Sequence, residues 1–163
     1  EKLVEDYARQ HGFESVIIRP SAVYGEWDVE DRVVSKFMLG AMRGETLKVK
    51  GAQEVLDFTY VEDAAQGIVQ AALSPTAANK VYNITRSDQT LVTLKVAAEL
   101  AIRIAGRGNL EIQDRDLAFP KRGRLNISRA VKDFGYNPTV SVEEGFQRYY
   151  TWFQNSKYWQ AKL

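Results

Sequence analysis

The sequence predicts a single α/β unit with a parallel sheet, and three observations lead to that class. A helical pattern over residues 1–11 is followed by a strand pattern over 15–20, which is half of a β-α-β unit, and the two patterns keep alternating downstream. The strand SVIIRP is almost continuously apolar, as in strands buried on both faces of a parallel sheet. No internal repeat or low-complexity tract divides the chain into separate units.

The remaining elements follow from apolar spacing and from capping residues. Thr93, Ser128 and Ser141 stand where a side chain can cap the helix that follows. Glu62 and Asp63 open a helix because acidic side chains favour the positive end of the helix dipole. In chain order we expect a loop over 20–31, a helix over 33–43, a strand over 47–51, a β-rich run over 55–61, a helix over 62–73 with Ala65, Ile68, Val69 and Ala72 lining one side, a strand over 80–84, a helix over 94–105, a strand over 110–113, helices over 129–134 and 142–153, and an irregular tail over 157–163.

Composition excludes several classes of function. Lys and Arg number 22 against 21 Asp and Glu, and a net charge of +1 provides no long-range field for nucleic acid or an anionic membrane. No apolar run approaches the roughly 20 residues that cross a bilayer. The chain has no cysteine, which excludes disulfides and thiolate metal sites and fits a cytoplasmic location. His11 is the only histidine, so we expect no metal site.

Six strings of the sequence carry a family resemblance. They are RPSAVYG, LKVKG, LDFTYVEDAAQGI, VYNI, PKRGRLNISRAVKDFGYNP and EEGFQRYYTWF. None is specific alone, but in this order and spacing they resemble the second half of the extended short-chain dehydrogenases/reductases, the NAD-dependent epimerases and dehydratases of nucleotide sugars. A glycine-rich dinucleotide turn such as GxGxxG is absent.

The resemblance implies that residues 1–163 are the carboxy-terminal portion of a Rossmann-like fold, comprising the last strands and helices of the parallel sheet and the small substrate-binding domain. Glu1 would lie four residues after the Lys of the catalytic Tyr-x-x-x-Lys motif. The dinucleotide-binding part and the catalytic residues would then precede this chain. We therefore expect the chain to contain no catalytic residue and to be inactive alone.

The resemblance also implies binding roles for ten residues. NAD or NADP, held mainly by the preceding part, would meet Pro20 and Ser21. The nucleotide-sugar substrate would meet a second set consisting of Ala22, Val23, Arg32, Val33, Lys48, Val49, Lys50 and Arg122. From the sequence alone, core packing is the favoured explanation for Val33 and Val49, and a solvated basic loop containing Arg122 and Arg124 is the alternative for Arg122. Helix 1–11 would form a homodimer.

Two positions depart from the family pattern. Ala22 stands where relatives often have an Asn that binds the substrate, and Leu56 where they often have an Arg that clamps the diphosphate. Two alternatives therefore stay open: an epimerase or reductase whose substrate lacks a diphosphate, and a non-catalytic binding protein. Epimerase, dehydratase and dehydrogenase are not distinguished. Asp63 is interpreted as structural, and Trp27 either covers the sugar or fills a gap.

Overall fold

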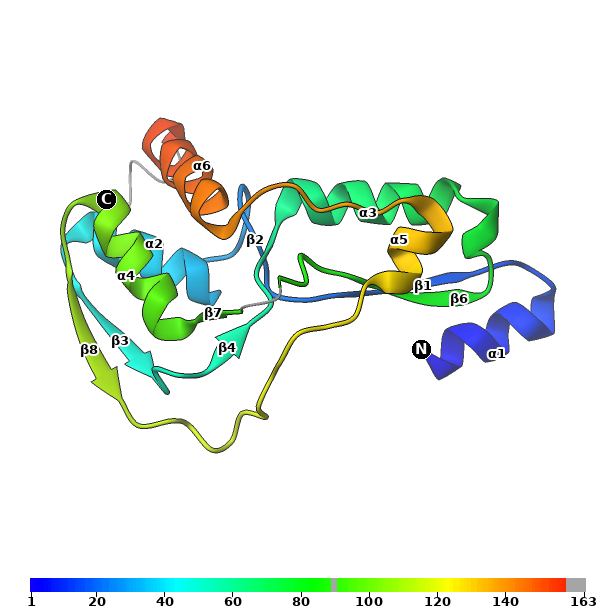
Figure 1. The fold of residues 1–163 in the computed structure, drawn as a ribbon, viewed down its shortest axis with the longest axis horizontal. Coiled ribbons are helices and arrows are strands. Elements are labelled where there is room, and N and C mark those ends of the chain that lie inside the picture. Colours follow the sequence, from blue (N-terminus) through cyan, green and yellow to red (C-terminus); the bar gives the residue numbers. More distant parts are fainter. Residues whose placement is uncertain (89–90, 158–163) are drawn as a thin grey trace.

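The computed structural model describes residues 1–88 and 91–157, and its elements form two lobes (Figure 1). The helical lobe consists of α2 (Val33–Arg43), β3 (Thr46–Lys50), β4 (Val55–Leu56), β7 (Val92–Thr93), α4 (Leu94–Ala105), β8 (Asn109–Gln113) and α6 (Val142–Asn155). The sheet lobe consists of α1 (Lys2–His11), β1 (Val16–Pro20), α3 (Val61–Leu73), the 3-10 turn η1 (Pro75–Ala77), β6 (Lys80–Ile84) and α5 (Ser128–Phe134). Two short strands, β2 (Val23–Tyr24) and β5 (Thr59–Tyr60), lie where the lobes meet.

Parallel pairing predominates among the described strands, which confirms the predicted α/β class. β1 pairs with β6 from Val16 opposite Lys80 to Pro20 opposite Ile84. The pairs β2–β5 and β3–β8 are also parallel. Only β4 and β7 pair in the antiparallel sense among these residues. The carboxyl ends of β1 and β2 therefore lead towards the junction of the lobes, where the chain passes from one lobe to the other.

The helical lobe has a continuous apolar core. α2 is buried along most of its length, and Phe37, Met38 and Ala41 pack with Ala97 and Ala101 of α4. α2 is apolar nearly all round, as expected for a helix that is covered on several sides. Aromatic side chains close the core towards the junction of the lobes: Tyr24, Phe58, Tyr60, Phe146, Tyr149 and Phe153.

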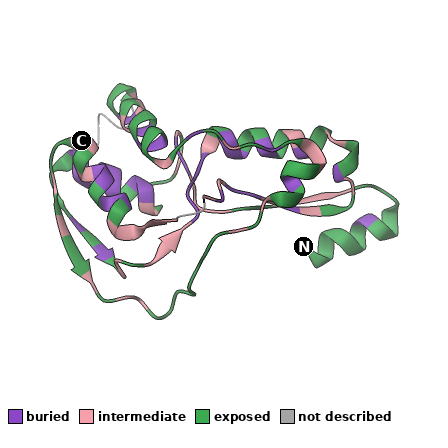
Figure 2. Ribbon diagram, in the orientation of Figure 1, coloured by how far each residue is buried: buried purple, intermediate pink, exposed green. Residues whose placement is uncertain are grey.

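The sheet lobe is less completely buried, and the prediction for its first strand is wrong (Figure 2). The strand over 15–20, expected to be buried on both faces, is half-buried and exposes Arg19 and Pro20. Its only strand partner among the described residues is β6, so only part of its surface is covered.

The predicted apolar stripe does line one side of α3, and that side is exposed at every position: Ala65, Ile68, Val69 and Ala72. The opposite side of the helix, with Ala64, Gly67 and Ala71, packs inward instead. Small residues prevail there because α3 approaches its neighbours closely. A Cβ at Gly67 would lie 2.6 Å from Ile84 Cγ2 and 2.7 Å from Tyr136 Cε2.

Local capping signals are confirmed at two helices and wrong at a third. Thr93 accepts a hydrogen bond from the Val96 N–H at 3.2 Å, and Ser141 accepts one from the Glu144 N–H at 3.1 Å. Ser128 is the first residue of α5 and caps nothing with its side chain. Its own N–H donates to Asn126 Oδ1 at 2.8 Å, because Asn126 stands two residues earlier and is better placed to accept.

Two further expectations concern chain segments. The β-rich run over 55–61 divides into β4 and β5, with Asp57 and Phe58 between them turning the chain towards the other lobe. Most of the tail over 157–163 lies outside the described residues. Within residues 1–88 and 91–157, no helix has the length and apolar character that a membrane span requires.

Candidate functional site

A cavity of about 950 Å³ lies in the helical lobe beside β2, β3 and the segment that follows β8. Its wall brings together most of the predicted substrate residues: Ala22, Val23, Arg32, Val33, Lys48, Lys50 and Arg122. Three predicted residues, Pro20, Ser21 and Val49, do not line it. The cavity therefore collects residues from separate parts of the sequence at one place.

The pleat of β3 explains which of its residues face the cavity. Successive strand side chains point to opposite sides, so Leu47 and Val49 enter the core while Lys48 and Lys50 face outward. Val49 is 1% exposed, and its side chain packs in the core. Any contact between Val49 and a ligand would therefore be made by the backbone.

The cations on the cavity wall that make no ion pair or side-chain hydrogen bond with another described residue include Lys48, Lys50 and Arg122. Glu111 lies opposite Lys48 in the β3–β8 ladder, but its carboxylate accepts a hydrogen bond from Gln113 Nε2 at 2.6 Å. These three cations consequently keep their donors available for a ligand.

Three acidic residues of the cavity wall pair with cations of the protein: Asp31, Glu45 and Glu54. Asp31 pairs with Lys36 at 3.3 Å. Glu54 accepts from Arg115 Nε at 2.8 Å, and a second nitrogen of Arg115 donates to the Phe119 carbonyl at 2.6 Å. The sequence did not predict the ion pair of Arg115 and Glu54, because the two residues lie in different loops. The sequence shows that both are charged but not that they lie side by side.

The loop after β2 supplies a partly buried acid, Asp28. Its carboxylate accepts from the Val29 N–H at 2.8 Å and from the Ser35 hydroxyl at 3.2 Å. Burial raises the pKa of Asp28 above its ordinary value, although both hydrogen bonds act in the opposite direction. The adjacent Trp27 is 83% exposed, does not line the cavity, and meets Trp152 edge-on at 5.5 Å between ring centroids.

Both departures from the family pattern lie on the cavity wall. Leu56 and Ala22 line it, so an apolar group stands at each position where the resemblance placed a polar one. Ala22 has φ of 40°, in the left-handed region that residues with a Cβ adopt rarely. Its carbonyl accepts from the Thr59 N–H at 3.3 Å, which links this turn to β5.

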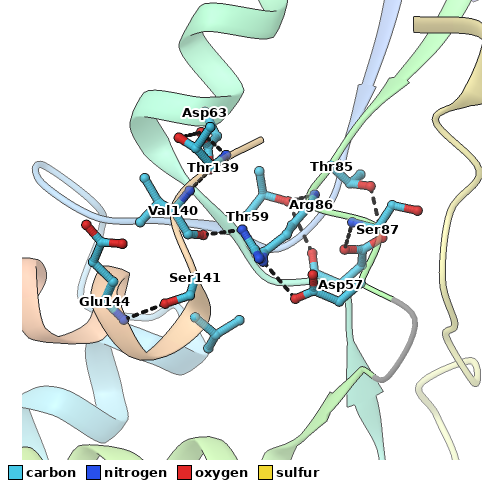
Figure 3. Close-up of polar contacts among 12 residues, drawn as sticks. Asp57, Thr59, Asp63, Thr85, Arg86, Ser87, Thr139, Val140, Ser141 and Glu144 are labelled. Atoms are coloured by element: carbon cyan, nitrogen blue, oxygen red, sulfur yellow. Dashed lines mark hydrogen bonds and ion pairs between the residues drawn. The ribbon is translucent and has the colours of Figure 1, made fainter. Parts of the chain in front are cut away.

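Two buried carboxylates accept hydrogen bonds from distant segments of the chain (Figure 3). Asp57 accepts the Ser87 N–H at 2.8 Å and the Thr85 hydroxyl at 2.9 Å. Asp63 accepts the backbone N–H groups of Thr139 at 2.9 Å and Val140 at 3.0 Å. The structural interpretation of Asp63 is confirmed. Its hydrogen bonds to this distant segment, in addition to the helix dipole, explain its position.

The comparisons with known proteins identify the family. Residues 1–85 match the model of the NAD dependent epimerase/dehydratase family. The chain belongs to this family. The short-chain dehydrogenase resemblance and the Rossmann-like fold class are therefore confirmed.

Relatives within the family share modest identity along most of the chain. A UDP-glucuronic acid decarboxylase of Arabidopsis thaliana is 30% identical over 89% of this chain and 42% of its own length. An uncharacterized protein of Methanocaldococcus jannaschii is 26% identical over all of this chain and 50% of its own length. The chain thus spans about half the length of these relatives.

Solved structures agree with the fold. A UDP-glucose 4-epimerase of Thermotoga maritima, determined with UDP-glucose, matches with a TM-score of 0.84 and 25% identity over 94% of this chain and 50% of that one. An epimerase of Methanothermobacter thermautotrophicus matches with a TM-score of 0.86 and 22% identity over 98% of this chain and 48% of that one.

Proposed function

We propose that this chain forms the substrate-binding wall of an NAD(P)-dependent nucleotide-sugar epimerase or dehydratase, with the diphosphate held in the cavity described above. The observation that carries the proposal is the convergence of Lys48, Lys50 and Arg122, all available for a ligand, on one cavity of this nearly neutral chain. A guanidinium can bind two phosphate oxygens at once, and each such bond contributes about 1.5–3 kcal/mol.

The chain would contact the cofactor at the carboxyl end of β1. Pro20 is exposed there, and the hydroxyl of the half-buried Ser21 makes no hydrogen bond with another described residue. These two residues could contact one end of a bound dinucleotide. The sequence contains no glycine-rich turn that would bind the diphosphate of the cofactor. When bound, NAD supplies the acceptor for hydride removed from a sugar carbon. The residues of this chain hold the sugar nucleotide in place for that transfer.

The catalytic Tyr and Lys of the family would come from chain that precedes Glu1, so residues 1–163 alone are proposed to be inactive. α1 would pair with its copy in a cytoplasmic homodimer. The exposed side chains of Leu3 and Tyr7 on α1 support such a contact, since 80% and 55% of their surfaces are exposed.

A thermal-shift titration tests the proposal on the complete protein expressed from its natural start. Binding to the native state raises the unfolding temperature. We expect NAD and one of UDP-glucose, UDP-glucuronate or dTDP-glucose each to stabilise the protein, and Arg122→Ala to remove most of the nucleotide-sugar shift. Lys121→Ala, which removes a neighbouring charge that does not line the cavity, is the matched control. No shift with any nucleotide sugar would contradict the proposal.

A second candidate is an epimerase or reductase whose substrate has no diphosphate. The apolar wall at Ala22 and Leu56 favours it, because both positions face the cavity. Stabilisation by NAD without stabilisation by any of the three nucleotide sugars is the result that this candidate predicts.

A further inference from the structure

Arg122 is carried by an extended segment with no secondary structure of its own. This segment, residues 116–124, is called the strap below; it follows β8 and leads to α5 (Figure 1). Residues 117–124 are all exposed. Little packing therefore fixes the place of Arg122, and its position depends on how the ends of the strap are held.

The first end of the strap is held by an ion pair. Arg115 donates Nε to Glu54 at 2.8 Å, and both side chains are about three-quarters buried. Arg115 also donates to the Phe119 carbonyl at 2.6 Å, which draws the beginning of the strap against the loop between β3 and β4. This anchor lies seven residues before Arg122 in the sequence.

The second end is held at the backbone of Leu125, directly after the strap. The Leu125 N–H donates to Asp57 Oδ2 at 3.2 Å, and the Leu125 carbonyl accepts from the Ser87 hydroxyl at 2.6 Å. The same hydroxyl accepts from Arg124 Nε at 3.0 Å. Both backbone polar groups of Leu125 are thus held by side chains from other segments, three residues after Arg122.

Asp57 joins these contacts into one unit. It is 1% exposed, and its two oxygens accept from Ser87, Thr85 and Leu125. Ser87 has φ of 57°, a conformation that is unfavourable for a serine and that its N–H bond to Asp57 helps to maintain. A carboxylate suits this position because it only accepts hydrogen bonds, and every neighbouring group donates.

We propose that Asp57 is a positioning residue that sets where Arg122 meets the substrate phosphate, by fixing the Leu125 backbone N–H at the end of the strap. The role rests on the proposed function, which gives Arg122 its phosphate. Asp57 does not line the cavity, so it acts on the substrate only through the strap.

The isosteric change Asp57→Asn separates this role from general packing. An amide offers one oxygen and one NH₂ group, so in either orientation one of the two backbone N–H groups, of Ser87 or Leu125, meets another donor. We expect UDP to bind on the order of tenfold more weakly, since a displaced Arg122 loses its paired hydrogen bonds. Ser87→Ala, which frees the Leu125 carbonyl, should weaken binding in the same direction.

A double-mutant cycle in the complete protein, with the dissociation constant of UDP as readout, provides the test. If Asp57 acts through Arg122, Asp57→Asn weakens binding in the native background but changes it less than twofold in the Arg122→Ala background. Equal effects in the two backgrounds would overturn the positioning role alone. Failure of the native protein to bind UDP, or full binding by Arg122→Ala, would overturn the proposed function as well.

Limited proteolysis with trypsin tests the role of Asp57 without a ligand. Trypsin cuts after Lys121, Arg122 and Arg124, and it requires a locally mobile chain. Asp57→Asn and Ser87→Ala should each raise the rate of cleavage in the strap several-fold. The matched control is Asp63→Asn, another buried carboxylate that accepts two backbone N–H groups but does not contact the strap. An unchanged rate in both test variants, or the same increase in the control, would contradict the role.

Discussion

The two lobes are built from equally clear sequence patterns but differ in how completely those patterns are buried. In the helical lobe, α2 buries both its apolar face and much of its flanks against α4 and β3. In the sheet lobe, α3 exposes its apolar stripe, and Leu73 at its end is 78% exposed. The difference shows that amphipathic spacing predicts a face suited to burial, while the identity of the covering element is a non-local property.

The largest expected difference between the lobes comes from truncating one apolar side chain in each. Phe146 is fully buried and packs edge-on against Tyr24 with ring centroids 5.2 Å apart. Phe146→Ala should lower the free energy of unfolding by about 3–5 kcal/mol. Leu73→Ala should change it by less than about 0.5 kcal/mol. Urea denaturation of the 163-residue chain measures both, and similar losses would show that Leu73 is covered in solution.

The next effect tests a place where α3 is tightly packed. Gly67→Ala would place a Cβ against the buried Ile84 and Tyr136, which have little room to move. Alanine favours a helix by about 1 kcal/mol, but overpacking costs about 1–3 kcal/mol, so we expect a net loss near 1 kcal/mol. Gln66→Ala, on the exposed side of the same helix, should be neutral or slightly stabilising. A stabilising Gly67→Ala would mean that the sheet lobe is loosely packed.

An effect of similar size distinguishes the helix caps of the two lobes. Ser141→Ala removes the bond to the Glu144 N–H and should cost about 1 kcal/mol of stability. Ser128→Ala in α5 should cost almost nothing, because its side chain caps no N–H group. Thermal unfolding of the two variants compares them directly. Equal losses of stability in the two variants would show that the Ser128 side chain does cap α5.

The smallest effect depends on pH and is confined to the sheet lobe. The hydrogen bond from the Tyr82 hydroxyl, followed by that from Lys80, holds the pKa of Asp133 below its ordinary value of 3.8. A lowered folded-state pKa stabilises the protein above the unfolded value, and this contribution is lost as the pH falls through the folded one. Asp133→Asn should therefore lower the unfolding temperature at pH 7. The deficit should shrink below pH 4, and a constant deficit would argue against this assignment.

The sequence predicts what is local. Thr93 and Ser141 are recognisable as caps because each bonds an N–H group three residues ahead. The alternation of β3 likewise predicts that Lys48 and Lys50 share a face. The order of helices and strands and the grouping of most candidate residues around one cavity were predictable in this way, the second with help from the family resemblance.

Contacts between distant segments could not be predicted. Asp57 reads as one polar residue within a β-rich run, yet its partner Leu125 lies 68 residues further along the chain. Arg115 and Glu54 are separated by 61 residues. No periodicity or spacing relates such pairs, so the anchors of the strap emerge only when the chain is folded. The exposed stripe of α3 has the same origin, since the pattern does not specify which side meets β6.

A crystal structure of the complete protein with UDP tests the central claim most directly. The account predicts the diphosphate in the cavity, with phosphate oxygens within hydrogen-bonding distance of the Arg122 guanidinium and beside Lys48 or Lys50. UDP bound elsewhere, or in this cavity with its phosphates directed away from Arg122, would contradict it.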